Sequence, residues 1–224
     1  FATRAGTYNS SANWITDNKL LDAHVTLAGN AVGNGIELCC GTGICGKALT
    51  EAGWNMTGVD ITPEMLEFAR KYIKGVHASA EKLPFENKLF DLAILRQAMF
   101  LFDTPVGLME IRRVLKNGAA FIVSQTVPFS EADEPWLREI HFSKQAQLLS
   151  FYNTQDIEKL LSNCGFNIIE KHTLSVRESI NRWMEYAPEL SDEKRKEICN
   201  MVANAPEEYK KARNVEVING EIFE

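Results

Sequence analysis

The chain has 224 residues and a mass of 25.2 kDa, a size typical of one domain. Its composition, 45% hydrophobic and 24% charged, is ordinary for a soluble globular protein. The net charge of -6 argues against a nucleic-acid groove, because such a groove needs a basic face. The five cysteines form no C-x-x-C pair, and no signal peptide or membrane-spanning run is visible, so we expect a cytoplasmic protein with reduced thiols. The chain opens on Phe1 rather than Met, so we expect the natural chain to begin upstream.

Short apolar runs alternate with helical patterns through the first part of the chain, which predicts strand–helix units and a mostly parallel sheet. A helix is predicted between Asp17 as N-cap and Gly29 as C-cap, and another begins at Thr62 with Pro63 in its first turn. Further helices are predicted at 46–53 and 105–118. Five strands are predicted here, at residues 35–38, 55–60, 75–78, 92–95 and 119–125.

The last part of the chain is less regular. Helices are predicted at 133–149 and 153–166, and two more within 175–205, opened by a capping box of Ser175 and Glu178. A sixth strand is predicted at 167–174 and a last one at 215–224. Residues 1–224 are thus expected to form one α/β domain, with a Rossmann-like, doubly wound, mostly parallel sheet of seven strands.

The stretch "IELCCGTGICG", residues 36–46, carries the glycine spacing G-x-G-x-x-G between a strand and a helix. Such a turn lets a ligand approach the backbone and offers it amides at the start of the helix. Asp60 ends the next strand and can accept hydrogen bonds from ribose hydroxyls. Both features suit NAD and S-adenosylmethionine equally.

Glu37 separates these two ligands, because it ends the first strand beside the turn. A carboxylate there repels the pyrophosphate of NAD but attracts the ammonium and sulfonium of S-adenosylmethionine. The alternative is a solvated glutamate at a strand end. An NAD oxidoreductase is therefore disfavoured.

The same stretch resembles motif I of the class I S-adenosylmethionine-dependent methyltransferases. Glu37 stands for the acid of that motif, residues 40–43 match its Cys-Gly-Thr-Gly, and Cys39 stands where a glycine is usual. "GVDITPEMLEFAR" resembles the next motif, with Asp60 as the ribose acid and Met65 near the adenine.

A third motif is similar to "SAEKLPFENKLFDLAILRQAMFLF", in which Ser79 replaces the aspartate expected to contact adenine. The resemblance covers residues 30–127 and "FYNTQDIEKLLSNCGF", and it is closest in kind to the ubiquinone/menaquinone C-methyltransferases and small-molecule methyltransferases. It implies S-adenosylmethionine as cofactor, with the backbone carbonyl of Arg96 on its ammonium. The cofactor-binding residues implied are Tyr8, Glu37, Cys39, Cys40, Gly41, Thr42, Gly43, Asp60, Ile61, Met65, Ala80, Glu81, Arg96 and Gln97.

Two long segments leave the carboxyl ends of strands, 126–150 and 175–214, and together with the N-terminal segment 1–16 they are expected to form a helical cap over the substrate. Their apolar side chains either line the acceptor site or form only the core of the cap; they are Tyr8, Trp14, Phe129, Trp136, Phe142, Trp183, Met184 and Tyr186. His141 is the candidate catalytic base, the alternative being a structural histidine. The four histidines lack metal-binding spacing, so no metal is expected.

These features predict an enzyme that transfers a methyl group in line to a small organic molecule. The alternatives are a methyltransferase for RNA or protein, and a non-catalytic partner subunit that binds S-adenosylmethionine. Neither a nucleic-acid partner nor membrane insertion is expected, and the oligomeric state and the atom methylated stay open.

Overall fold

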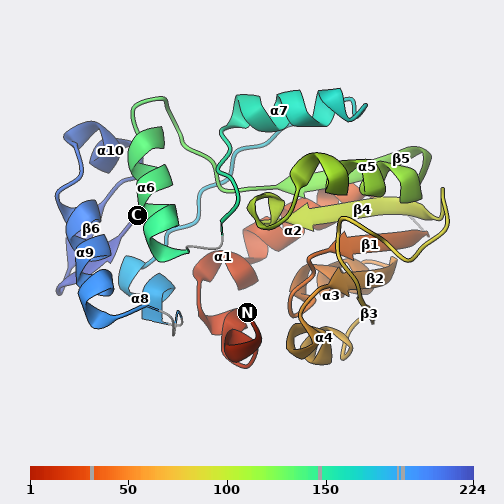
Figure 1. The fold of residues 1–224 in the computed structure, drawn as a ribbon, viewed down its shortest axis with the longest axis horizontal. Coiled ribbons are helices and arrows are strands. Elements are labelled where there is room, and N and C mark those ends of the chain that lie inside the picture. The colour runs from red at the N-terminus through yellow and green to blue at the C-terminus, as the bar shows by residue number, and fades with distance from the viewer. Residues whose placement is uncertain (31–32, 146–147, 186, 188–189) are drawn as a thin grey trace.

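The structure, a computed structural model, describes residues 1–30, 33–145, 148–185, 187 and 190–224. Five parallel strands form the main sheet in the order β3-β2-β1-β4-β5 (Figure 1). Two neighbouring strands in the middle of the sheet, residues 34–38 and 90–96, are almost wholly buried, as expected where helices cover both faces of a sheet. The strands are β1 (Asn34–Leu38), β2 (Asn55–Asp60), β3 (Lys74–His77), β4 (Phe90–Arg96) and β5 (Leu115–Ser124).

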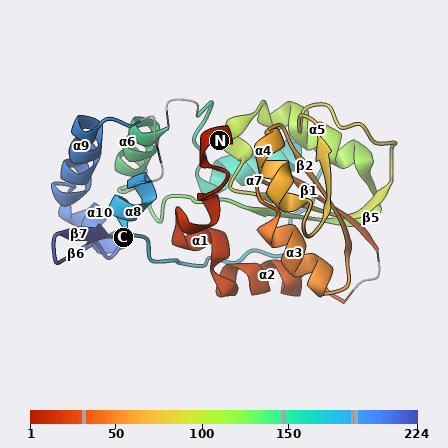
Figure 2. The same ribbon diagram turned by 90° about the horizontal axis from the view of Figure 1, so that it is seen from below.

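Helices pack on both faces of this sheet (Figures 1 and 2). One face carries α2 (Asn18–Ala28), α3 (Ile44–Glu51) and α4 (Pro63–Ala69), whose apolar side chains share a core with Met56, Leu92 and Ile94. The other carries α5 (Thr104–Val114) and α7 (Thr154–Asn163), which pack on Ile36, Leu38 and Leu95.

The caps predicted for the first helix are confirmed. The carboxylate of Asp17 accepts the amide of Leu20 at 2.9 Å, and Gly29 follows α2 with a φ of 69°. A capping box that the sequence analysis did not name opens α7, where Asn153 and Asp156 exchange side chain–backbone hydrogen bonds.

A second body of helices lies beside the sheet and has a core of its own (Figures 1 and 2). It consists of α6 (Glu134–Lys144), α8 (Ile180–Glu185), α9 (Asp192–Ala203), α10 (Glu207–Ala212) and the hairpin β6 (Glu216–Ile218) with β7 (Glu221–Phe223). We call this body the cap. The N-terminal elements η1 (Ala2–Arg4), η2 (Tyr8–Ser10) and α1 (Asn13–Thr16) lie between the cap and the sheet, and η3 (Met99–Leu101) follows β4.

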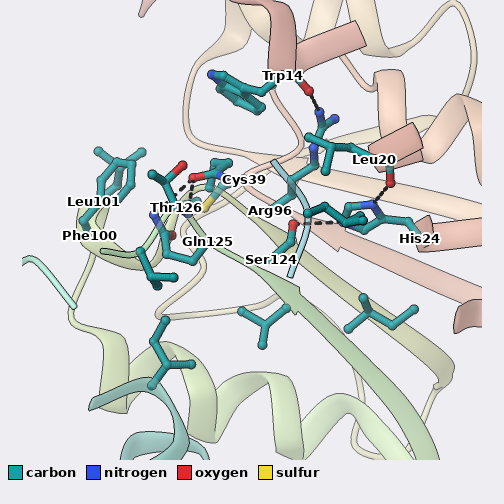
Figure 3. A pocket seen from close by; sticks show the side chains of 18 of the residues that line it. Trp14, Leu20, His24, Cys39, Arg96, Phe100, Leu101, Ser124, Gln125 and Thr126 are labelled. Carbon is teal, nitrogen blue, oxygen red and sulfur yellow. Dashed lines mark hydrogen bonds between the residues drawn. The ribbon is translucent and has the colours of Figure 1, made fainter. Parts of the chain in front are cut away.

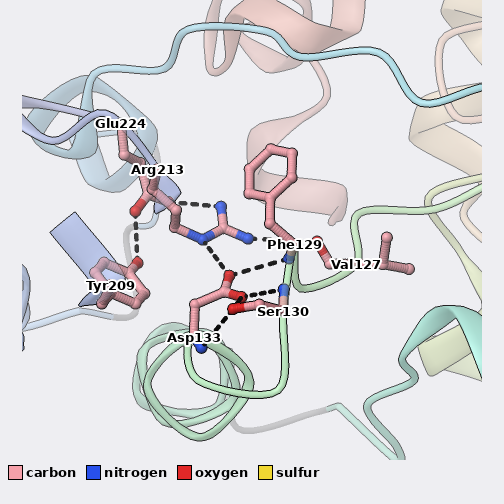
Figure 4. Close-up of polar contacts among 7 residues, drawn as sticks. All are labelled: Val127, Phe129, Ser130, Asp133, Tyr209, Arg213 and Glu224. Atoms are coloured by element: carbon pink, nitrogen blue, oxygen red, sulfur yellow. Dashed lines mark hydrogen bonds and ion pairs between the residues drawn. The ribbon is translucent and has the colours of Figure 1, made fainter. Parts of the chain in front are cut away.

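An ion-pair network fastens the cap to the loop that follows β5 (Figure 4). Asp133 is fully buried and receives the Nε–H of Arg213 at 3.1 Å and the amide of Ser130 at 2.6 Å. Arg213 also lies 3.7 Å from Glu224, which accepts the hydroxyl of Tyr209 at 2.6 Å. The network joins α6, α10 and the end of β7, so these parts of the cap hold one another in place.

The expectation of seven strands in one sheet is wrong, since the main sheet has five. Residues 167–174 form no strand, and Ile169 is 95% exposed. Residues 216–223 form a separate antiparallel hairpin instead. Asn219 and Gly220 at its turn have φ of 54° and 84°, the geometry that Asn-Gly hairpins prefer, so local pairing replaces pairing with the main sheet.

Two local expectations also need correction. The helix predicted to run to Gly118 ends at Val114, and β5 begins directly at Leu115. Ser175 and Glu178 form no capping box on α8. The Glu178 carboxylate accepts the amides of Asn13 and Trp14 instead, at 2.9 and 2.6 Å, and so ties the N-terminal segment to the cap.

Candidate active site

The glycine turn between β1 and α3 has the backbone that its sequence predicts. Gly41 and Gly43 have φ of 52° and 75°, in the left-handed region that glycine tolerates. A Cβ on Gly43 would lie 3.0 Å from Ala69, so this glycine also allows close packing of α4. Cys39 has a φ of 51° without being glycine, which places a strained residue where the resembling family usually has a glycine.

Glu37 lies beneath the turn, not in the cleft. Its carboxylate is 3% exposed and accepts the amide of Gly46, inside α3, at 2.8 Å. Burial raises its pKa to about 7, although Arg96 and the Gly46 amide act in the opposite direction. The expectation that Glu37 points toward the cleft is therefore wrong, and any effect on a bound cation acts through space from below.

Asp60 lies at the rim of the cavity, at the end of β2. One carboxylate oxygen accepts the amide of Gly41 and the other that of Thr62, each at 2.8 Å. A carboxylate oxygen can accept two hydrogen bonds, so each keeps one position for a ribose hydroxyl. The position is thus suited to the predicted role.

The side of the cavity where adenine is expected is formed by the segments after β2 and β3. Ile61 is 68% exposed there, an unusual state for a large apolar side chain, while Met65 and Ala80 are buried and also line the cavity. Glu81 lines it as well, but its carboxylate accepts the amide of Asp103 at 2.7 Å. This combination of apolar faces and backbone groups is what an adenine ring needs.

The N-terminal segment covers the glycine turn. The Tyr8 ring would lie 3.6 Å from a Cβ on Gly41, and the Thr42 hydroxyl lies 2.5 Å from the Asn9 amide oxygen, to which it donates. Burial raises the pKa of Tyr8 to about 12, so its hydroxyl stays protonated and can donate. Thr42 thus holds the segment and, like Cys40 and Gly43, does not line the cavity.

Arg96 is engaged with the N-terminal segment, as Figure 3 shows. Its guanidinium donates to the carbonyls of Trp14 and Ile15 and lies 5.0 Å from the centre of the Trp14 ring. The guanidinium is therefore engaged by the N-terminal segment. Gln97 has a φ of 53°, and its side-chain oxygen accepts the amide of Thr126 at 2.9 Å, which joins the ends of β4 and β5.

The cavity has a volume of about 1520 Å³ and extends from the glycine turn to the cap. Phe100, Gln125 and Thr126 line it from the sheet side (Figure 3). Of the apolar side chains expected to line an acceptor site, four line this cavity: Tyr8, Trp14, Phe129 and Trp183. Trp136, Phe142 and Met184 do not line this cavity, and Tyr186 lies outside the described residues.

His141 lines the cavity from α6, in an aromatic setting. Its ring centre lies 5.3 Å from that of Trp183 and 5.9 Å from that of Phe151. Burial lowers its pKa to about 3, and the nearby cations Lys144 and Arg213 lower it further. The imidazole is therefore neutral at ordinary pH and resists taking up a proton, which argues against the predicted role as general base.

Sequence reasoning missed a polar pair on the inner wall. His24 of α2 bonds the carbonyl of Leu20 through Nδ1 at 2.6 Å and the hydroxyl of Ser124 through Nε2 at 2.9 Å (Figure 3). Burial lowers the pKa of His24. The signal for it was a histidine on the apolar face of a predicted helix.

Among the described residues no three His, Cys, Asp or Glu side chains gather to hold a metal ion. None of the helices described has both the length and the apolar character that crossing a membrane requires.

Comparisons with known proteins agree with this site. Residues 36–123 match the family described as a methyltransferase domain. The crystal structure of the YcgJ protein from Bacillus subtilis has the same fold, with a TM-score of 0.81 at 18% identity over 91% of this chain and 92% of that one. Residues 36–123 thus form a methyltransferase domain similar to those of the class I S-adenosylmethionine-dependent methyltransferases. The cofactor of such a domain is S-adenosylmethionine.

Two curated relatives are similar over part of the methyltransferase. The demethylmenaquinone methyltransferase of Staphylococcus aureus strain JH9 is 34% identical over 41% of this chain, but only 42% of that protein is covered. The uncharacterized protein MJ1123 of Methanocaldococcus jannaschii is 28% identical over 67% of this chain and 72% of that one. The chain thus spans less than half of the relative whose reaction is named.

The side chains of this methyltransferase fit the cofactor. Asp60 has free acceptor positions for the ribose, and the exposed Ile61 and buried Met65 offer apolar faces to adenine. Asp60, and Glu37 in its ionised form, suit a ligand that carries an ammonium and a sulfonium. Individual contacts of the fourteen predicted cofactor residues stay predictions.

Proposed function

We propose that this chain transfers the methyl group of S-adenosylmethionine to a small organic molecule by in-line displacement. One observation carries the proposal: the cavity continues past the glycine turn to side chains of the N-terminal segment and the cap. Trp14, Phe100 and Trp183 give that part of the cavity aromatic walls. Such a space suits a small apolar or aromatic acceptor better than a polymer.

The walls of this cavity would act mainly by positioning. When bound, S-adenosylmethionine supplies a methyl group on a sulfonium, a leaving group that needs no acid. The remaining task is to hold the acceptor atom about 3–3.5 Å from the methyl group and in line with its bond. The aromatic walls exclude water, and His141, held neutral, contributes ring surface rather than a base.

The similarity to demethylmenaquinone methyltransferase supports a small apolar acceptor but does not identify it, since less than half of that protein is covered. A methyltransferase for RNA or protein is the alternative. The net charge of -6 speaks against RNA, whose phosphates require a basic surface. A non-catalytic subunit that only binds the cofactor is the third possibility.

A labelling experiment separates these three functions. The purified protein is incubated with methyl-labelled S-adenosylmethionine and a cell extract, and the label is measured in the dialysable and the macromolecular fractions. The proposal expects label in the dialysable fraction, and far less of it with Asp60→Asn. Label confined to RNA or protein would contradict it, and cofactor binding without transfer to either fraction would indicate a non-catalytic subunit.

A further inference from the structure

A buried arginine without a counter-ion forms part of the cavity wall. Arg4, the last residue of η1, is 7% exposed and lines the cavity. Within the described part of the chain its guanidinium has one hydrogen bond, to the hydroxyl of Ser11 at 3.4 Å, and no ion pair. Its Nε–H is buried and has no acceptor among the residues that the structure describes.

Burying this guanidinium destabilises the protein unless a ligand supplies the missing hydrogen-bond acceptors. An arginine cannot lose its charge in a protein, so burial cannot be relieved by deprotonation. A buried charge without partners is strongly destabilising, and proteins pair nearly all of them. The planar guanidinium fits a carboxylate through two parallel N–H···O bonds, so a carboxylate is the ligand chemistry that matches it.

The position of Arg4 places such a carboxylate inside the cavity. Its guanidinium carbon lies 5.9 Å from the ring centre of Tyr8, and Tyr8 in turn borders Gly41. A second aromatic ring, that of Phe1, also lies 5.9 Å away. Arg4 therefore stands near the glycine turn, on the same side of the cavity as Tyr8.

We propose that Arg4 binds a carboxylate in this cavity. Two ligands can supply it: the amino-acid part of S-adenosylmethionine, or an acceptor that is itself a carboxylic acid. The proposal rests on the proposed function, because both ligands belong to that reaction. In either case Arg4 is a binding residue that the glycine motif does not reveal.

The test uses Arg4→Met, which keeps the apolar stem and removes the charge, with Arg70→Met as the control. Arg70 is exposed at the end of α4 and does not line the cavity. Calorimetry measures the binding of S-adenosylhomocysteine, which has the carboxylate, and of 5′-methylthioadenosine, which lacks it. In protein saturated with S-adenosylhomocysteine, benzoate and its neutral analogue benzamide then probe the acceptor space.

If the carboxylate belongs to the cofactor, Arg4→Met should weaken the binding of S-adenosylhomocysteine roughly 10-fold or more and leave the binding of methylthioadenosine unchanged. A carboxylate on the acceptor predicts the same loss for benzoate, but not for benzamide, with S-adenosylhomocysteine unchanged. Arg4→Lys keeps the charge without the fork and should recover part of either loss. Arg70→Met should match the wild type throughout.

The stability of the ligand-free protein provides an independent readout. If Arg4 awaits an anion, Arg4→Met removes an uncompensated buried charge, and the ligand-free Tm should stay the same or rise. The proposal is overturned if neither carboxylate probe is affected. It is also overturned if all probes weaken equally while the Tm falls, because Arg4 is then structural. A wild-type protein that binds no S-adenosylhomocysteine would instead refute the proposed function itself.

Discussion

The Asp60 carboxylate holds the glycine turn and is also predicted to bind the ribose of the cofactor, so a substitution that tests the second role must preserve the first. It accepts the amides of Gly41 and Thr62, so removing the whole carboxylate would also disturb the glycine turn. Asp60→Asn keeps one oxygen and the shape of the side chain. We predict that it weakens binding of S-adenosylhomocysteine by about 1.5–3 kcal/mol, the usual value of hydrogen bonds to a charged group. Calorimetry on a variant shown to be folded would measure this, and an unchanged Kd would remove Asp60 from the site.

Glu37 should make the stability of the ligand-free protein depend on pH. Its pKa is raised from 4.5 to about 7 in the folded protein, so the folded state binds a proton that the unfolded state has lost between these values. Stability should therefore fall as the pH rises from about 4.5 to about 7, by an amount on the order of 3 kcal/mol. Above that range Glu37 should contribute no further change.

Glu37→Gln isolates this effect, because the amide keeps an oxygen for the Gly46 amide but does not titrate. Urea unfolding at pH 5 and pH 7.5 would give the free energy of unfolding for both proteins. The difference between the two pH values should be smaller in the variant by the amount stated above. Equal pH dependence in both proteins would show that Glu37 titrates normally and that burial is relieved in another way.

His141 should leave no trace in the pH dependence of the rate. With a pKa of about 3, it is neutral throughout the range in which the enzyme can be assayed. His141→Asn should therefore retain the wild-type pH profile and lose less than the roughly 10²-fold that marks the loss of a general base. An ionisation near pH 6.5 that disappears in the variant would restore His141 as the base.

At the level of elements, Glu178 decides how firmly the N-terminal segment lies over the cavity. It reaches from the start of α8 to two amides of α1, and this segment also carries Tyr8. In Glu178→Ala both amides lose a charged acceptor, a loss of about 1.5–3 kcal/mol. Hydrogen exchange at Asn13 and Trp14 should accelerate roughly 10- to 100-fold, and the affinity for S-adenosylhomocysteine should fall.

The matched control is Glu170→Ala, an exposed carboxylate that contacts only His172 among the described residues. Exchange at Asn13 and Trp14 should be unchanged there. If Glu178→Ala also leaves these amides protected, the segment is held by its other contacts, which include Thr42 and the two arginines Arg96 and Arg182 that donate to its carbonyls.

How much of the fold could be predicted from the sequence depends on how far apart in the chain the interacting residues lie. The strands β1 to β5 and the helices between them were predicted because their caps, glycines and apolar periods are local, as at Asp17 and Gly29. The hairpin at Asn219 and Gly220 was mistaken for a strand of the main sheet. The turn determines that its two flanking strands pair with each other, but an apolar run in the sequence does not show which strand it pairs with.

The candidate site was likewise predicted where its residues lie close together in the chain and missed where folding brings them together. Asp60 and the glycine turn were found because their spacing along the chain is fixed by the strand–helix unit. The direction of Glu37 and the partners of Glu178 could not be found, since each depends on a residue brought close only by folding. Arg4 was missed for the same reason: nothing in its own neighbourhood shows that it becomes buried without a counter-ion.

For the molecule as a whole, the cap and the sheet are two bodies with separate cores that share one cavity. A deletion of residues 175–214 would not separate them cleanly, because Leu137 and Ile140 of α6 pack in the same core as Ile198 and Val202 of α9. A single substitution in the network of Figure 4 is the better test.

We choose Asp133→Asn for this test, because Asp133 is fully buried and compensates the charge of Arg213, whose side chain is 8% exposed. Breaking a buried ion pair on one side typically costs about 3–5 kcal/mol, and here the pair joins α6 to α10 within the cap and holds the cap to the loop after β5. The cap should therefore open while the sheet stays folded. Binding of S-adenosylhomocysteine should be nearly unchanged, and methyl transfer should be lost, because the far wall of the acceptor space is then missing.

Hydrogen exchange resolved by segment would show whether α6, α9 and α10 lose protection before the strands of the main sheet. Glu197→Gln is the matched control, since its pair with Lys194 is exposed on the same body and should contribute less than about 1 kcal/mol. Transfer at the wild-type rate by a variant with an open cap would show that the sheet and the N-terminal segment suffice to hold the acceptor. Parallel loss of cofactor binding and cap protection would show that the two bodies unfold as one, and that the acceptor wall also supports the cofactor site.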